Sequence, residues 1–113
     1  MYLVILLKKD LKMKKKNWRH TKEYKHWRIN IIRRDKVCQI CNTRKHREAH
    51  HLNHSMYFKD ERFDINNGIT LCKHCHSVFH TSFKRSYRTK CTKYDFLQFK
   101  ELISRMTIIL KGE

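Results

Sequence analysis

The chain has 113 residues, which is enough for one small domain, and a domain of this size often needs a metal or a covalent cross-link to supplement its core. Its 27 Lys and Arg against 10 Asp and Glu give a formal net charge of +17. Such an excess favours a polyanionic partner, with nucleic acid as the first candidate; a solvated basic surface or an anionic membrane surface is the alternative. The absence of proline and the presence of only two glycines argue against a flexible linker or an internal repeat.

Residues 1–36 form a basic N-terminal segment. Residues 1–7 are apolar but too short to span a bilayer and lack the features of a secretory signal, so we expect an edge strand or a tail. For the chain as a whole we expect DNA as the partner and no membrane. Further on, Tyr24, Trp27 and Ile31 recur at helical spacing and predict a helix with a basic outer face. Trp27 is expected in the core, whereas Trp18 is expected to pack in the core or to contact DNA. The candidate nucleic-acid-binding residues are Lys14, Lys15, Lys16, Arg19, Lys22, Arg28, Arg33 and Arg34.

Four of the five cysteines form two C-x-x-C pairs, Cys38 with Cys41 and Cys72 with Cys75. Each pair presents two thiolates on one tight turn, and zinc in structural sites favours four such ligands. The pattern predicts one structural zinc held by all four, in a reducing compartment such as the cytoplasm. The fifth, Cys91, is expected to be a small buried apolar residue or an idle thiol.

The segment between and after these pairs predicts short strands followed by helices. Asn67-Gly68 is typical of a turn between two extended segments, here residues 62–65 and 69–71. A helix is expected from Cys75 onward. A last helix should begin near Thr92 with a cap from Asp95, and its apolar stripe should comprise Phe96, Phe99, Ile103, Met106 and Leu110.

The histidines form a second constellation that does not need the cysteines. His76 and His80, four residues apart on a helix, can bind one cation together, with His50 as a third ligand from a strand. His51 points to the opposite side of that strand and is free to act as a general base. Its second ring nitrogen needs a carbonyl or amide oxygen to hold it, and Asn67 is the candidate.

Together these motifs resemble the HNH endonucleases, whose core is a ββα-metal finger. The resemblance rests on Cys-x-x-Cys, Ala-His-His-Leu at residues 49–52 and Asn-Gly-Ile-Thr-Leu-Cys-x-x-Cys-His at residues 67–76, and it covers roughly residues 27–83. Residues 62–72 look especially like phage-encoded and homing-type members. The resemblance implies one α+β domain with three parts: the basic segment and helix (1–36), the finger (37–83) and a C-terminal helical extension (84–113).

The same resemblance implies a role for each residue that matches the motif. His51 would be the general base, Asn67 would orient it, and His76 would be a ligand of the catalytic cation. His50 stands where the family places Asp or His as a ligand, and His80 matches the extra ligand of His-rich members such as the nuclease colicins. Because this set is all nitrogen, zinc, nickel or another transition metal suits it, while magnesium or manganese would need phosphate oxygens to complete the shell.

Several neighbouring residues have other expected roles. Asn66 is the second choice for the motif asparagine. His54, His74 and His46 are expected to be exposed polar residues or phosphate contacts, and Glu48 to form an ion pair with a nearby Arg.

The sequence thus predicts a metal-dependent DNA endonuclease, acting as a monomer or homodimer, that either nicks one strand or cleaves both. The rivals are a non-catalytic zinc-stabilised nucleic-acid-binding module and an RNA-directed nuclease with the same site.

Overall fold

The computed structural model describes residues 17–83 and 89–111, and side chains up to Thr107 in the last helix. Its elements form an α+β arrangement of a two-stranded sheet and three α-helices, with short 3-10 turns and one π-helical turn. The expectations for residues 1–7 and for Lys14, Lys15 and Lys16 lie outside the described residues.

The basic helix α2 spans Lys22–Asp35 and follows a 3-10 turn, η1, at Trp18–His20. It begins where the Thr21 hydroxyl accepts a hydrogen bond from the Tyr24 backbone N–H at 3.3 Å, a normal N-cap. Trp27 and Ile31 are its buried residues, which confirms the predicted apolar stripe and the core position of Trp27.

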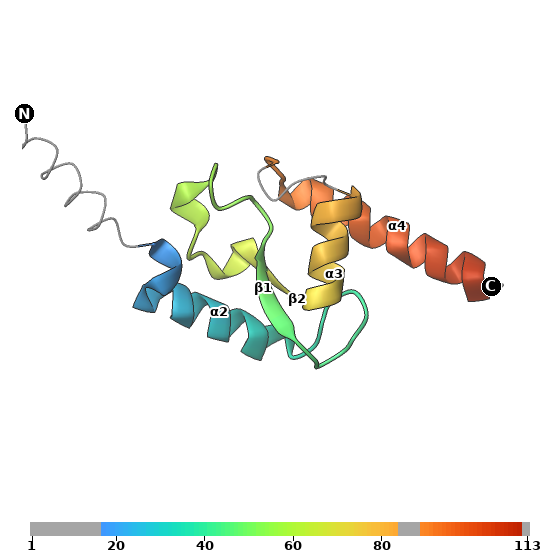
Figure 1. Cartoon of the computed structure of the whole chain (residues 1–113), viewed down its shortest axis with the longest axis horizontal. Helices are drawn as coiled ribbons and strands as arrows, with labels where there is room; N and C mark the ends of the chain where they lie inside the picture. Colours follow the sequence, from blue (N-terminus) through green and yellow to red (C-terminus); the bar gives the residue numbers. More distant parts are fainter. Residues whose placement is uncertain (1–16, 84–88, 112–113) are drawn as a thin grey trace, which may run out of the picture.

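Strand β1 (Arg47–His51) pairs antiparallel with strand β2 (Gly68–Cys72), so that Arg47 faces Cys72 and His51 faces Gly68. Helix α2 lies along this pair on one side and α3 on the other (Figure 1). The approach of α2 is very close at Gly68, where an added Cβ would lie 1.8 Å from Ile31 Cδ1. The Asp35 carboxylate also accepts a hydrogen bond from the Thr70 backbone N–H at 2.8 Å.

The predicted hairpin around Asn67-Gly68 is wrong. Residues 62–64 are not a strand, and η3 (Ile65–Asn67) is a 3-10 turn that leads into β2, whose partner is β1. The cause is local: the Asp64 carboxylate accepts the Asn66 N–H at 2.9 Å and the Asp64 carbonyl accepts the Asn67 N–H at 3.0 Å. These bonds close the turn and leave no extended segment before β2.

Helix α3 (Lys73–Val78) starts directly at the end of β2 and continues as the π-helical turn η4 (Phe79–Phe83). Helix α4 (Lys93–Lys111) starts as predicted, because the Asp95 carboxylate accepts both the N–H and the hydroxyl of Thr92, at 2.8 and 3.2 Å.

The main core lies between β2, α3, η4 and α4. Leu71, Phe79, Phe96 and Phe99 are buried there, and Cys91 is 1% exposed, which confirms it as a small buried residue. The apolar stripe of α4 is buried at its start, but Met106 is 48% exposed, because the helix runs on past the body of the molecule (Figure 1). The side chain of Leu110 lies outside the described residues.

Candidate functional site

The four paired cysteines converge. Cys38 and Cys41 lie on the tight turn before β1, and Cys72 and Cys75 at the junction of β2 and α3; their four Sγ atoms all lie within 4.8 Å of one another. Zn–S bonds of about 2.3 Å in a tetrahedron place sulfur atoms about 3.8 Å apart, and the Sγ atoms of Cys41 and Cys72 are 3.6 Å apart. The cluster is therefore compatible with a structural zinc site.

The thiol electrostatics fit such a site. Desolvation opposes ionisation of Cys38, but backbone hydrogen bonds from Cys41 and Cys72 outweigh it and lower the pKa of that thiol to about 7. Burial and the hydrogen bond with Cys72 raise the pKa of Cys75. Four crowded thiols cannot all ionise without a cation, and a bound Zn²⁺ supplies the missing positive charge.

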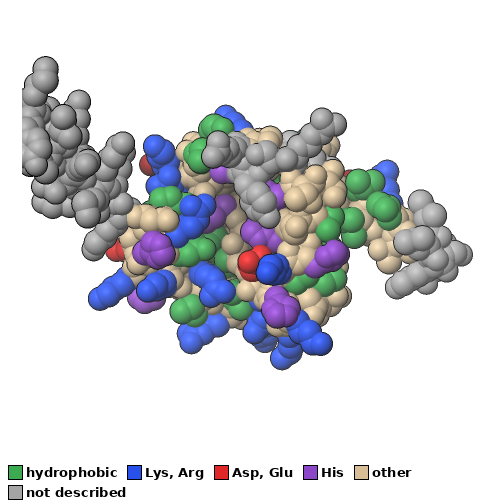
Figure 2. Space-filling view, in the orientation of Figure 1, with side chains coloured by type: hydrophobic (Ala, Val, Ile, Leu, Met, Phe, Trp, Pro, Cys, Tyr) green, Lys and Arg blue, Asp and Glu red, His purple; other side chains and the backbone are tan. Residues whose placement is uncertain are grey.

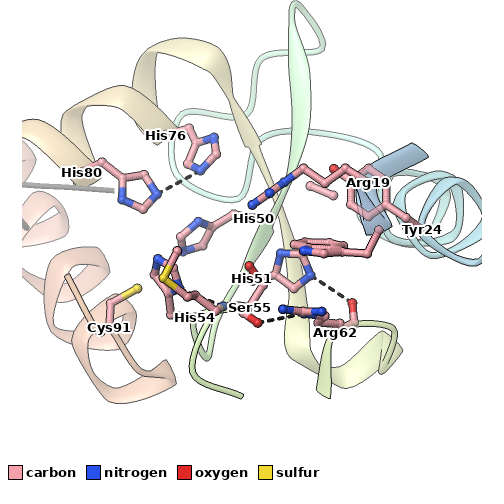
Figure 3. A pocket seen from close by; sticks show the side chains of 13 residues that line it. Arg19, Tyr24, His50, His51, His54, Ser55, Arg62, His76, His80 and Cys91 are labelled. Atoms are coloured by element: carbon pink, nitrogen blue, oxygen red, sulfur yellow. Dashed lines mark hydrogen bonds between the residues drawn. The ribbon is translucent and has the colours of Figure 1, made fainter. Parts of the chain in front are cut away.

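Three histidines form a second cluster, separate from the cysteines. His50 comes from β1, His76 from α3 and His80 from η4, and one ring nitrogen from each lies within 4.8 Å of the others. The Nε2 atoms of His76 and His80 are 3.1 Å apart. Figure 3 shows the three rings turned toward one another.

His50 is the most buried member, at 3% exposure. Its Nε2 is buried and, among the residues that the structure describes, finds no hydrogen-bond partner. Burial, with the neighbouring His76 and His80, lowers the pKa of His50 well below the usual range and keeps the ring neutral, which is the form that binds metals. A buried, unpartnered imidazole nitrogen beside two other imidazoles is an environment that a divalent cation would satisfy.

A carboxylate contacts one member of this cluster: Glu48 Oε1 is 3.1 Å from His76 Nδ1. Metal-binding histidines commonly have their second ring nitrogen held by a carboxylate in this way. The expectation of a Glu48–Arg ion pair is thus replaced by a contact with His76. The signal was present in the sequence, because Glu48 precedes His50 by two residues and so lies on the same face of β1.

His51 lies on the other face of β1, as predicted. Its ring stacks on Trp27, with centroids 4.0 Å apart and planes 10° apart, and its Nε2 is 2.9 Å from the Arg62 carbonyl oxygen. A carbonyl only accepts, so Nε2 carries the proton and Nδ1 carries the lone pair. The edge of Trp18 also contacts His51, with ring centroids 5.6 Å apart.

The direct contact predicted between Asn67 and His51 is wrong. Asn67 is 4% exposed, and its side chain accepts the Asn53 N–H at 2.7 Å and donates to the carbonyls of Asn53 and Glu61, each at 3.1 Å. These bonds close the loop between the strands just before Arg62. Asn67 therefore holds the loop that carries the Arg62 carbonyl and does not contact His51, while Asn66 is exposed.

Desolvation lowers the pKa of His51 to about 4, with a contribution from the positive charge of Arg19, although the bond to the Arg62 carbonyl opposes the shift. The ring is therefore neutral at neutral pH. His54, expected on the surface, is instead 9% exposed; its ring lines the same pocket as His50 and His51, and its Nδ1 accepts the Met56 N–H at 3.1 Å in a local turn.

A pocket of about 350 Å³ lies between the cluster of three histidines and His51 (Figure 3). His50, His76 and His80 lie on one side, with His51 toward the other. Arg19 and Arg62 complete the latter side, their guanidinium groups 4.2 and 4.7 Å from the centroid of the Trp18 ring. The Arg62 Nε also donates to the Ser55 carbonyl at 2.9 Å, which fixes this side of the pocket.

The remaining predicted nucleic-acid contacts divide into two groups. Lys22, Arg28 and Arg33 are exposed on α2, and Figure 2 shows Lys and Arg side chains gathered along the edge formed by α2 and the loop before β1. Arg34 is different, because it donates to the carbonyls of Ile65 and Gly68 at 2.7 and 2.6 Å and pairs with Asp35. Its guanidinium thus holds the start of β2.

Comparison with protein-family models, with curated proteins and with solved structures found no match to this chain. Among the described residues, no helix combines the length and the apolar character needed to cross a membrane.

Proposed function

We propose that the chain is a metal-dependent DNA endonuclease of the HNH type, with β1, β2 and α3 as its ββα-metal finger. The observation that carries the proposal is one pocket in which a cluster of three histidines faces a separately held fourth, His51. A structural zinc site alone would need the cysteines but neither this pocket nor the buried, unpartnered nitrogen of His50.

His50, His76 and His80 would hold the catalytic cation, with Glu48 orienting His76. When bound, such a cation stabilises negative charge on the phosphoryl group and on the leaving 3′ oxygen. Zinc, nickel or another transition metal suits three imidazoles, and phosphate oxygens from the substrate would complete the shell for magnesium or manganese.

His51 would accept the proton of the attacking water at Nδ1, since Nε2 is occupied by the Arg62 carbonyl. Its lowered pKa keeps it neutral and ready to accept, and a phosphodiester bound beside it would raise its proton affinity. Arg19, which lines the same pocket, would bind the nonbridging oxygens of the phosphate. The products would carry 5′-phosphate and 3′-hydroxyl ends.

The sequence as a whole fits this activity. A net charge of +17 favours a polyanionic substrate, and four thiols that must stay reduced to hold zinc fit the cytoplasm. One chain holds one such pocket among its described residues. A monomer with one pocket would nick one strand, and a homodimer with two pockets would cut both strands.

The test is conversion of supercoiled plasmid to nicked or linear forms with added divalent cations. His51→Ala should slow cleavage by about 10²–10⁴ with zinc content and DNA affinity near wild type. His26→Ala removes an exposed histidine of α2 and is the matched control. DNA binding without cleavage by the wild type would instead leave a zinc-stabilised binding module, and preferential cutting of RNA would reassign the substrate.

A further inference from the structure

We propose that a second, separate basic groove, between α2 and the loop before β1, binds the phosphate backbone of duplex DNA beyond the cleavage pocket. This inference rests on the proposed function for its choice of partner. The groove has a volume of about 400 Å³, and its charged lining residues are Arg28, Arg33, Arg44 and Arg47, with His46 beside them.

The composition of the groove is the first argument. All its charged lining residues are cationic, and none of the residues lining it is Asp or Glu. Among the residues that the structure describes, the side chains of Arg28, Arg33 and Arg44 form no hydrogen bond or ion pair, and all three are exposed. Three unpaired guanidinium groups around one hollow repel each other unless an anion lies between them.

The way the groove is built is the second argument. Arg47 is half-buried and donates to the Lys36 carbonyl at 2.7 Å. This bond ties the start of β1 to the end of α2 and so fixes the distance between the two sides of the groove. Arg28 and Arg33 stand on the rigid helix. Guanidinium groups on such supports bind phosphate oxygens with less loss of side-chain entropy than a lysine tail would.

The position relative to the cleavage pocket is the third argument. Tyr24 lines the pocket, and Arg28 and Arg33 line the groove, all on α2. At about 100° and 1.5 Å per residue, Arg28 lies on nearly the same face of α2 as Tyr24 and about 6 Å further along the axis, which equals about two base-pair steps of B-DNA, while Arg33 lies another turn on, around the helix. A duplex whose scissile phosphate lies in the pocket can therefore reach the groove a few phosphates away.

The experiment compares Arg28→Gln/Arg44→Gln with Lys93→Gln/Lys100→Gln, which removes the same charge from exposed positions on α4. Binding to a duplex of about two helical turns is followed by fluorescence anisotropy over a range of salt concentrations. The groove variant should lower the slope of log affinity against log salt by about two, one for each phosphate contact, while the control stays near wild type.

Hydrolysis of bis(p-nitrophenyl) phosphate, which is small enough to need the pocket alone, separates the two proposals. The groove variant should hydrolyse it at the wild-type rate. If the wild type fails to hydrolyse it but the slope still falls, the groove stands and the proposed nuclease function does not. Equal slopes of log affinity against log salt for the groove variant and the control would overturn the proposal that the groove binds DNA. A loss of RNA-duplex binding with DNA binding unchanged would overturn it as well.

Discussion

At the scale of single residues, the proposed catalytic cluster depends on groups that are not themselves ligands. Glu48 contacts the Nδ1 of His76, and the Arg62 carbonyl holds the Nε2 of His51. Both contacts fix a ring and select which nitrogen carries the proton. The contact at one ring nitrogen therefore decides that the other, Nε2 of His76 or Nδ1 of His51, carries the free lone pair.

Glu48→Gln tests the first of these contacts. The amide keeps an oxygen that can accept the N–H of His76, but it lacks the negative charge of the carboxylate. That charge makes the imidazole a stronger metal ligand. We expect affinity for the catalytic cation to fall by about 10–100-fold, measured by calorimetric titration of zinc-loaded protein with Ni²⁺ or Mn²⁺. Glu23→Gln, an exposed change on α2, should have no effect. Unchanged affinity in Glu48→Gln would show that the carboxylate does not support the site.

The lowered pKa of His51 predicts an unusual pH profile. The neutral ring is the active form, and a folded-state pKa of about 4, below the usual 6.5, means that this form persists down to about pH 5. At saturating cation, kcat/KM, which reports the free enzyme, should therefore be flat between about pH 6 and about pH 8 as far as His51 is concerned.

Cation binding to His51→Ala, measured at each pH, separates loss of the cation from titration of the base. A rise in kcat/KM centred near the ordinary imidazole pKa, with cation binding constant, would contradict the buried, neutral state of His51.

At the scale of elements, the packing of α2 against β2 depends on Gly68. Its φ of −136° is open to any residue, so the requirement is purely steric: a Cβ would overlap Ile31 Cδ1. Gly68→Ala should lower the free energy of unfolding by about 1–3 kcal/mol, as overpacking does. Urea denaturation followed by tryptophan fluorescence measures this directly, since Trp27 lies in the same contact.

Ile31→Val removes the Cδ1 atom and provides the matched control. Alone it should cost about 0.5–1.5 kcal/mol. Combined with Gly68→Ala it should relieve part of the overlap, so the double variant should be more stable than the sum of the single changes predicts. Strict additivity would mean that the two side chains do not compete for the same space.

The same elements show what the sequence could and could not predict. Local signals were sufficient for the cap of α4 by Thr92 and Asp95 and for the spacing that brings His76 and His80 together. Alternation along β1 also placed His50 and His51 on opposite faces. These features depend on residues a few positions apart, where helix and strand geometry decides the outcome.

The failures concern the loop between the strands. Asn-Gly is a strong turn signal, but here Asn67 is buried and its side chain binds the backbone at Asn53 and Glu61. The Arg62 carbonyl could not be predicted as the holder of His51, because every residue has a carbonyl and its direction depends on the path of the whole loop. His54 was misplaced for the same reason.

At the scale of the whole molecule, apolar packing lies on both sides of a sheet that has two strands in residues 17–83 and 89–111. Trp27 and Ile31 pack on one side, and Phe79 and Phe96 on the other. An isolated two-stranded sheet is marginally stable in water. The cysteine cluster joins the turn before β1 to the β2–α3 junction, so a zinc there would fasten both strands and α3 at one point.

Cys72→Ser should therefore abolish zinc binding and cooperative folding together. Serine keeps an oxygen that can accept the Cys75 N–H now bound by the Cys72 sulfur, so the N-cap of α3 is preserved and the change isolates the metal. Structural zinc carries about 10–16 kcal/mol of apparent binding free energy in small fingers, which is comparable with the whole free energy of unfolding of a small domain, about 5–15 kcal/mol. Zinc content by elemental analysis and thermal melting by circular dichroism measure the two effects.

Cys91→Ala is the control, because it removes a buried thiol that lies outside the cluster. It should keep its zinc and lose little stability. His76→Ala should likewise keep the zinc and the thermal transition while losing the catalytic cation, since its ligand cluster shares no residue with the cysteines. A native-like transition in zinc-free Cys72→Ser would show that apolar packing alone holds the two sides of the sheet together.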